Sequence, residues 1–235
     1  MTYTILGRCA KTGRLGIGIA TFSITVGRYA HCAKAMTGVT ISQAFANENN
    51  NQRALRLLSE GFGADSVLEQ LKANDELFTY RQIGVIDRTG RAAAYTGTGP
   101  RPWAGHVSGD NYIATGNGLV GPHVVEAIAR GFLAEPDADL EHRLLMGIEY
   151  GRDAGGQGTR EVHKAERSAA LLVYSRNAHP DIDLRVDLHE TAVEELRRVW
   201  VEYKKYEAYY QHRGEHPRGA MSQEVFMATL QAADG

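Results

Sequence analysis

The residue types at the start of the chain are those of a self-contained hydroxyl nucleophile. The sequence begins Met1-Thr2, and a small residue at position 2 permits an aminopeptidase to remove the methionine. Thr2 would then carry a hydroxyl and a free α-amine, whose pKa is ordinarily about 7.7–8.0, so that much of the amine is a base near neutral pH. One residue that holds both groups is the N-terminal threonine variant of hydroxyl catalysis. Threonine also occupies position 2 in many proteins without such chemistry.

A hairpin is the element that must position Thr2. Tyr3–Arg8 is predicted to be a strand, Lys11–Arg14 a turn and Leu15–Ala20 a second strand. Thr2 would therefore lie at the edge of a sheet, at the start of its first strand.

Strands and helices follow in pairs along the rest of the chain. Hairpin turns such as Asp87-Arg88-Thr89-Gly90 favour antiparallel strands, and the missing βαβ alternation argues against a doubly wound parallel sheet. Two sheets packed face to face, with a helix pair outside each, explain why the strands are almost continuously apolar. The fold class is therefore predicted to be α+β, a four-layer αββα sandwich. The further strands are expected at Val39–Gln43, Arg81–Ile86, Arg91–Tyr95, Tyr112–Thr115, Ser168–Tyr174 and Asp183–Asp187, and the helices at Asn50–Glu60, Ala64–Asn74, Pro122–Leu133, Leu140–Ala154 and Thr191–Tyr210.

This layering, entered by a strand that begins at Thr2, resembles the N-terminal-nucleophile (Ntn) hydrolase fold. It is most similar to a bacterial and archaeal family with that fold whose function is unknown. The resemblance extends to about Trp200, so a single domain over residues 1–235 is expected, with a helical extension from about residue 204. Its landmarks, in chain order, are Thr2–Ile5, Thr12–Gly16, Ser42–Asn47, Arg81–Asp87, Ala94–Gly97, Trp103–His106, Gly116-Asn117, Gly155-Gly156, Ser168–Val173 and Asp183–Asp187.

The resemblance implies an amidohydrolase that acts on a small molecule or peptide, without a cofactor or metal. The Thr2 hydroxyl would attack an amide carbonyl while its own amine accepts the proton. Donors of an oxyanion hole are commonly worth about 3–4 kcal/mol each. The candidates for oxyanion or substrate binding are Gln43, Asn47, His106 and Asn117, although amide side chains at turns also serve as caps.

Two positions can be compared with the proteasome-like members of this fold, and the first departs from them. Those relatives place an acidic residue after the second strand, whereas this chain has Ala20-Thr21-Phe22-Ser23. Lys34 falls near the lysine of such relatives and is a weak catalytic candidate. Its simpler interpretation is a surface lysine on a short helix. A non-catalytic binding or assembly protein that keeps the Ntn fold is therefore the alternative to an enzyme.

Composition narrows the class of protein and its partners. The chain has 235 residues, 43% of them hydrophobic, which is enough for one large core. Its net charge is −2 and no basic face stands out, so nucleic acids and anionic membranes are not expected as partners. Cys9 and Cys32 are too few for a disulfide framework and are expected to be reduced thiols. Charged residues interrupt any signal-peptide core near the N-terminus. A cytoplasmic protein is expected.

Three other motifs suggest different chemistry. Residues 116–121 read Gly-Asn-Gly-Leu-Val-Gly, a dinucleotide-type pattern between a strand and a helix. A second helix instead of a strand follows that helix, so the βαβ unit is missing, and the glycines are expected to form a tight strand-to-helix turn. Residues 212–216 have the His-x-x-Glu-His spacing of zinc peptidases, but Gly214 and Pro217 predict a solvated connector instead of a helix. Four residues could also be metal ligands or turn formers, namely Asp181, Asp183, Asp187 and His189.

An aromatic stripe on the last long helix predicts self-association. The stripe includes Trp200, Tyr203, Tyr206 and Tyr210 at helical spacing. Tyrosine-rich surfaces are typical of interfaces. A homo-oligomer, most simply a dimer that packs around Tyr203, Tyr206 and Tyr210, is therefore expected.

Overall fold

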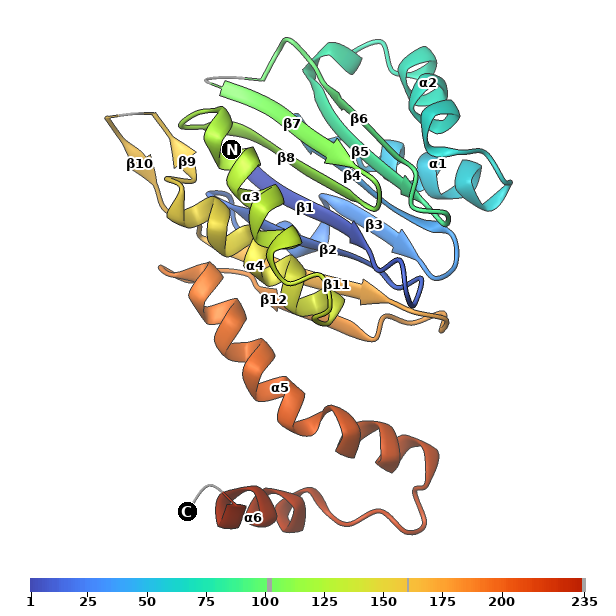
Figure 1. Ribbon diagram of the computed structural model, residues 1–235, viewed down its shortest axis with the longest axis vertical. Coiled ribbons are helices and arrows are strands. Elements are labelled where there is room, and N and C mark those ends of the chain that lie inside the picture. Colours follow the sequence, from blue (N-terminus) through green and yellow to red (C-terminus); the bar gives the residue numbers. More distant parts are fainter. Residues whose placement is uncertain (101–102, 160, 234–235) are drawn as a thin grey trace. The chain divides into compact units, whose positions relative to one another are not determined.

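The computed structural model describes residues 1–100, 103–159 and 161–233, which form two compact units, Met1–Leu196 and Arg197–Gly235 (Figure 1). The boundary between the units falls inside helix α5 (Ala192–Glu215), close to Trp200, where the resemblance seen in the sequence ends. The second unit also contains α6 (Gln223–Ala233).

The larger sheet of the first unit is built around the strand that begins at Thr2. All its strand pairs in the described residues are antiparallel, in the order β10-β9-β8-β1-β2-β11-β12, and β7 also pairs with β8. The first strand therefore lies between β2 and β8 instead of at an edge (Figure 1). The strands of this sheet are β1 (Thr2–Arg8), β2 (Leu15–Thr21), β7 (Trp103–Gly109), β8 (Tyr112–Leu119), β9 (Gln157–Gly158), β10 (His163–Lys164), β11 (Ser168–Tyr174) and β12 (Ile182–Val186).

The smaller sheet is an antiparallel set of four strands in the order β3-β4-β5-β6. Helices α1 (Glu48–Ser59) and α2 (Ala64–Asn74) cover one of its faces, where Leu57 and Val67 pack with Ile83 and Val85. Short 3₁₀ helices, η1 (Val26–Arg28) and η2 (Phe78–Tyr80), lead into β3 and β5. The strands are β3 (His31–Lys34), β4 (Gly38–Ala44), β5 (Arg81–Asp87) and β6 (Ala92–Thr96).

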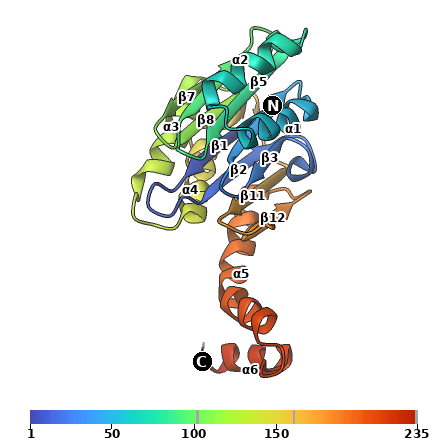
Figure 2. The same cartoon turned by 90° about the vertical axis from the view of Figure 1, so that its right-hand side faces the viewer.

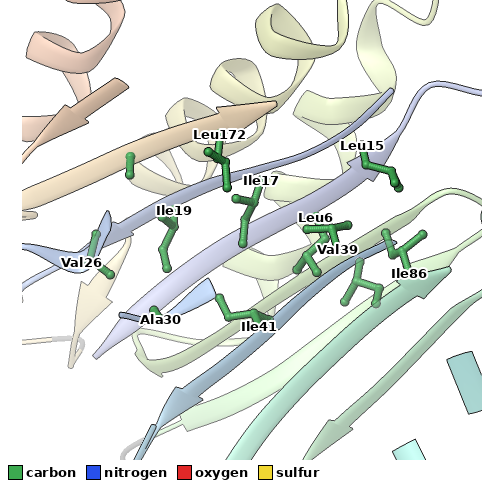
Figure 3. Packing of buried hydrophobic residues seen from close by; sticks show 12 residues of the cluster. Leu6, Leu15, Ile17, Ile19, Val26, Ala30, Val39, Ile41, Ile86 and Leu172 are labelled. Atoms are coloured by element: carbon green, nitrogen blue, oxygen red, sulfur yellow. The ribbon is translucent and has the colours of Figure 1, made fainter. Parts of the chain in front are cut away.

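A buried apolar cluster joins the two sheets. Figure 3 shows Leu6 and Ile17 of the larger sheet with Val39, Ile41 and Ile86 of the smaller one. These residues alternate along their strands, so the same face of β1 that carries Leu6 also carries Thr2 and Thr4. Burial of this face fixes the register of β1 and hence the direction in which the Thr2 side chain points.

Helices α3 (Pro122–Ala134) and α4 (Leu140–Asp153) cover the opposite face of the larger sheet (Figure 2). The approach is close because the strands carry glycine at the contact: a Cβ atom at Gly18 would lie 2.9 Å from the Leu144 carbonyl oxygen. The mixed α and β architecture predicted from the sequence is confirmed.

Several elements differ from the sequence prediction. Lys34 does not lie on a short helix, because residues 31–34 pair with β4 as an edge strand and Ala33 packs on the apolar cluster. Only the end of the glycine motif forms the expected tight strand-to-helix turn, because β8 continues through Asn117 to Leu119 and Val120 and Gly121 alone connect it to α3. The strand β7 had no counterpart in the prediction.

The second unit is a helical pair with an aromatic contact. The α5 helix continues past Gly214 to Glu215, so residues 212–215 are not the expected connector. The ring of Tyr209 stacks on Phe226 of α6 with centroids 4.2 Å apart, and Tyr206 packs against the same ring. Tyr210 remains 42% exposed. In residues 1–100, 103–159 and 161–233, none of the helices has the length and hydrophobicity needed to cross a bilayer.

Candidate functional site

Thr2 lies at the start of β1 with its side chain in a polar end of the space between the sheets. In the two ladders that flank β1, it is opposite Thr21 of β2 and Asn117 of β8. Only 8% of Thr2 is exposed. The backbone on both sides therefore holds the hydroxyl in a fixed position.

Thr21 connects Thr2 to the residue before it. The two threonine hydroxyl oxygens are 3.0 Å apart, and the Thr21 hydroxyl donates to the Met1 carbonyl. A hydroxyl has a single proton. Because Thr21 gives its proton to Met1, the hydroxyl of Thr2 is the donor between the two threonines. In the chain that retains Met1, the Thr2 proton is thus directed at Thr21.

Met1 occupies a defined position beside Gly118. Gly118 has φ +65°, and a Cβ atom there would lie 2.4 Å from Met1 Cγ. Burial lowers the pKa of the Met1 α-ammonium group below its ordinary value of 8.0. This end of the sheet therefore favours a neutral amine.

Gln82 of β5 is the centre of a buried hydrogen-bond network facing Thr2 and Thr4. Its Oε1 accepts from Gln43 Nε2 at 2.6 Å and from Asn117 Nδ2 at 3.1 Å. Its Nε2 carries two protons and lies within hydrogen-bond distance of three acceptors, namely the carbonyl oxygens of Gly116 and Gly105, at 2.8 and 3.1 Å, and the Thr96 hydroxyl, at 3.0 Å. Gln82 is 0% exposed, so these bonds replace water completely.

The network fixes which way the neighbouring amides point. Gln43 uses its Nε2 for Gln82, and its Oε1 accepts from the Thr4 hydroxyl at 2.7 Å. Asn117 directs one N–H at Gln82, and within the described parts of the chain its second N–H has no hydrogen-bond partner. Asn117 thus offers a fixed amide donor opposite Thr2.

His106 of β7 lies at the outer end of the same network. The Thr96 hydroxyl oxygen is 3.0 Å from Gln82 Nε2 and 2.9 Å from His106 Nδ1, and the direction of the second hydrogen bond depends on the ring tautomer. We assign Nδ1 as the acceptor, with the ring proton on Nε2, because this gives the Thr96 proton a partner among the described residues. Partial burial lowers the pKa of His106 below 6.5, which favours this neutral ring.

Two of the predicted site residues lie elsewhere. Lys34 is paired with Gly38, at the opposite end of β4 from Gln43, and its Nζ donates to Ser59 Oγ at 3.1 Å. Asn47 is the N-cap of α1, where its Oδ1 accepts from the Asn49 amide at 3.1 Å. The structure thus brings together Thr2, Gln43, His106 and Asn117 but leaves Lys34 and Asn47 outside that group.

Four residues of this site lie in segments noted in the sequence but were given no role in the site: Thr4, Thr21, Gln82 and Thr96. The sequence did contain a signal for them, because each is a hydroxyl or amide residue at an inward-facing position of a largely apolar strand. A buried polar group without a partner is costly, so such positions indicate a hydrogen-bond network.

The alternative motifs find other roles. Gly116 and Gly118 lie within β8, where Gly116 is paired with Tyr3 and Gly118 is at an irregularity of the ladder, so they do not form a phosphate loop. In the described ranges, no group of three or more His, Cys, Asp or Glu residues is arranged to hold a metal ion.

The comparisons with known proteins cover the first unit. The family of unknown function DUF1028 matches residues 2–196. A crystal structure of a Silicibacter pomeroyi protein of the same family is 28% identical, with a TM-score of 0.78 over 86% of this chain and 89% of that one. The ancestral β-subunit Anbu from Yersinia bercovieri is 11% identical, with a TM-score of 0.40 over 86% of this chain and 94% of that one. No curated protein sequence matches the chain significantly.

Proposed function

This chain belongs to the DUF1028 family of unknown function, as its resemblance to such a family indicated, and we propose that it is an Ntn-type amidohydrolase with an αββα sandwich fold. The nucleophile is Thr2, and the substrate is an amide of a small molecule or peptide. The observation that carries the proposal is the position of Thr2, with its hydroxyl against Thr21 and an oriented amide donor on Asn117.

The chemistry requires the removal of Met1. The free α-amine of Thr2 then accepts the hydroxyl proton, directly or through a water, while the oxygen attacks the amide carbonyl carbon. The second N–H of Asn117 donates to the oxyanion, and the protonated amine returns the proton to the leaving nitrogen. Water hydrolyses the resulting ester and restores Thr2.

Thr21 lies in the segment Ala20–Ser23, which has no counterpart of the acidic residue that proteasome-like relatives place after the second strand. Thr21 has no charge, so it contacts the Thr2 hydroxyl without raising the pKa of the amine. Burial at this end lowers the pKa of the Met1 amine, and the same surroundings would keep the amine of Thr2 neutral, so that it can accept the hydroxyl proton.

The second candidate is a binding or assembly protein without catalysis. The uncharged segment Ala20–Ser23, where proteasome-like relatives have an acidic residue, favours it, and a chain that retained Met1 would have no free amine on Thr2. For either function we propose a cytoplasmic location. We also propose a homodimer formed through Tyr203, Tyr206 and Tyr210, which truncation after Val201 should dissociate in light-scattering measurements.

The test compares processed wild-type protein with Thr2→Ala and Thr2→Ser. Alanine and serine at position 2 also permit Met1 removal, which intact mass verifies, so the three proteins differ only in the nucleophile. A library of amides is screened for release of the amine. We expect activity in the processed wild type, reduced activity with serine and none with alanine. Activity that survives Thr2→Ala would exclude Thr2 as the nucleophile, and a native protein that keeps Met1 would favour the binding function.

A further inference from the structure

A groove of about 690 Å³ lies at the same end of the larger sheet as Thr2. One wall is Phe22, directly after β2, and Arg167, directly before β11. The other wall is formed by residues 188–191, which follow β12. All these residues belong to the first unit.

Phe22 of the groove directly follows Thr21, the residue whose hydroxyl contacts Thr2. The Arg167 amide donates to the Thr21 carbonyl at 2.8 Å, and Thr21 is the residue that contacts the Thr2 hydroxyl. Ser168 is paired with Thr21 and Thr21 with Thr2, so Arg167 and Thr2 are two strands apart. At the usual spacing of strands, their Cα atoms are about 10 Å apart. A ligand of two to three residues in length has that span.

The lining combines an exposed apolar surface with positive charge. Phe22 is 37% exposed and Leu188 62% exposed, although both are large apolar residues. The Arg167 guanidinium and the Lys164 ammonium each lie 5.6 Å from the centroid of the Phe22 ring. Arg167 has no ion-pair partner in the part of the chain that the structure describes, and Glu190 is the carboxylate in the lining.

We propose that this groove selects the substrate of the Thr2 site, and that the substrate is an N-acyl dipeptide or tripeptide whose C-terminal residue has an apolar side chain. The C-terminal carboxylate binds Arg167, and the side chain of that residue packs on Phe22 and Leu188. An amide carbonyl further along the peptide then reaches toward Thr2. This inference rests on the proposed function, but binding to the groove can be measured without turnover.

The positive charges of Arg167 and Lys164 favour a ligand with a carboxylate over one with a neutral or cationic group. A guanidinium is suited to a carboxylate because it offers two parallel N–H donors, and its stacking on an aromatic ring leaves those donors in the ring plane free. Lys164 adds a second cation beside the same ring. Glu190 would repel a second negative charge, so a ligand with one carboxylate fits better than a dianion.

The experiment uses Thr2→Ala protein and two probes, N-acetyl-L-phenylalanine and its neutral carboxamide. Titration calorimetry or ligand-observed NMR should show binding of the acid and weaker binding of the carboxamide. Arg167→Gln should weaken binding of the acid by about 10-fold or more, because one charge-assisted pair is lost. Arg167→Lys should keep part of the affinity, and Arg130→Gln, an exposed change on α3, should have no effect.

The outcomes separate this inference from the proposed function. Equal affinity for the two probes, or an Arg167→Gln variant that is folded by circular dichroism and binds as tightly as its parent, would overturn the groove assignment. No binding of either probe at millimolar concentration would also overturn it. Binding that depends on Arg167, in a protein whose processed form hydrolyses no amide, would instead support the groove and count against the catalytic role of Thr2.

Discussion

Thr2 and Asn117 lie directly opposite each other in the ladder between β1 and β8. The Asn117 amide is also bonded to Gln82 of the other sheet at 3.1 Å. The larger sheet therefore holds the candidate nucleophile and the candidate oxyanion donor side by side, and the smaller sheet orients the Asn117 amide through Gln82. A shift of one sheet against the other would break the bond to Gln82, so the packing between the sheets determines the direction of the Asn117 donor.

Thr21→Val should impair catalysis while leaving the fold intact. The change removes the hydroxyl that lies 3.0 Å from the Thr2 hydroxyl but keeps the shape of the side chain. We expect turnover of the processed enzyme to fall by about 10- to 100-fold, and thermal stability to fall by about 1 kcal/mol for the lost hydrogen bond. Thr21→Ser should retain most activity. Thr40→Val, at a buried threonine on the helix-covered side of the smaller sheet, is the matched control, and an equal loss of turnover there would contradict a specific role for Thr21.

Gln82→Leu should destabilise the protein more than any exposed glutamine substitution. It removes the acceptor of the Gln43 and Asn117 amides and leaves the Gly116 carbonyl without its donor. Buried polar groups without partners cost about 1–3 kcal/mol each, so we expect a loss of at least about 2 kcal/mol in urea unfolding. Gln70→Leu, at a partly exposed position on α2, should change stability by less than about 0.5 kcal/mol. Similar values for the two variants would show that the network is not a stabilising unit.

Much of the fold follows from local sequence patterns. The hairpins β1–β2 and β5–β6 were predictable because turn residues separate apolar strands. The strands β3 and β7 were not, because His31–Lys34 is short and polar and Trp103–Gly109 contains two glycines. Their strand conformation comes from ladders with β4 and β8, which are tertiary interactions that override local propensity.

The site was predictable only in part for the same reason. Thr2 could be named as a candidate nucleophile because that chemistry depends on its position at the start of the chain. Gln82 could not be assigned as the centre of the network, since that role depends on contacts between β5 and β8 of different sheets. Asn47 illustrates the opposite error: a polar residue after a strand has the same sequence signal whether it lines a site or caps a helix, and here it caps α1.

His106 should be a neutral ring with its proton on Nε2. Thr96 holds Nδ1 as an acceptor at 2.9 Å, and partial burial keeps the pKa of the ring below its ordinary value. Long-range ¹H–¹⁵N spectra at pH 7 should therefore show one protonated and one unprotonated ring nitrogen, with Nε2 protonated. Thr96→Val should shift the ring toward a mixture of tautomers, whereas Thr98→Val, at an exposed neighbouring position, should not. A protonated Nδ1 in the wild type would contradict the hydrogen-bond assignment.

His31 should make the protein less stable as the pH falls from 6.5 toward 4. Its buried Nδ1 has no hydrogen-bond partner in the described residues, and burial, with Arg185 nearby, lowers its pKa from 6.5 to about 4, against a smaller opposing effect of Asp183. In that pH range the unfolded chain binds a proton that the folded chain does not, so unfolding becomes easier as the pH falls.

The full shift would correspond to at most about 3 kcal/mol. Urea unfolding of His31→Asn at pH 7 and pH 4.5 should show a smaller pH-dependent loss than the wild type. His179→Gln, at an exposed histidine, should behave as the wild type does. If His31→Asn and the wild type lose the same stability between the two pH values, His31 is not the titrating group. The loss at low pH would then have to come from carboxylates whose pKa is lowered in the folded protein, such as Asp75, with a pKa of about 2 despite the opposing effect of burial, because Arg81 and Asn50 bind its charged form.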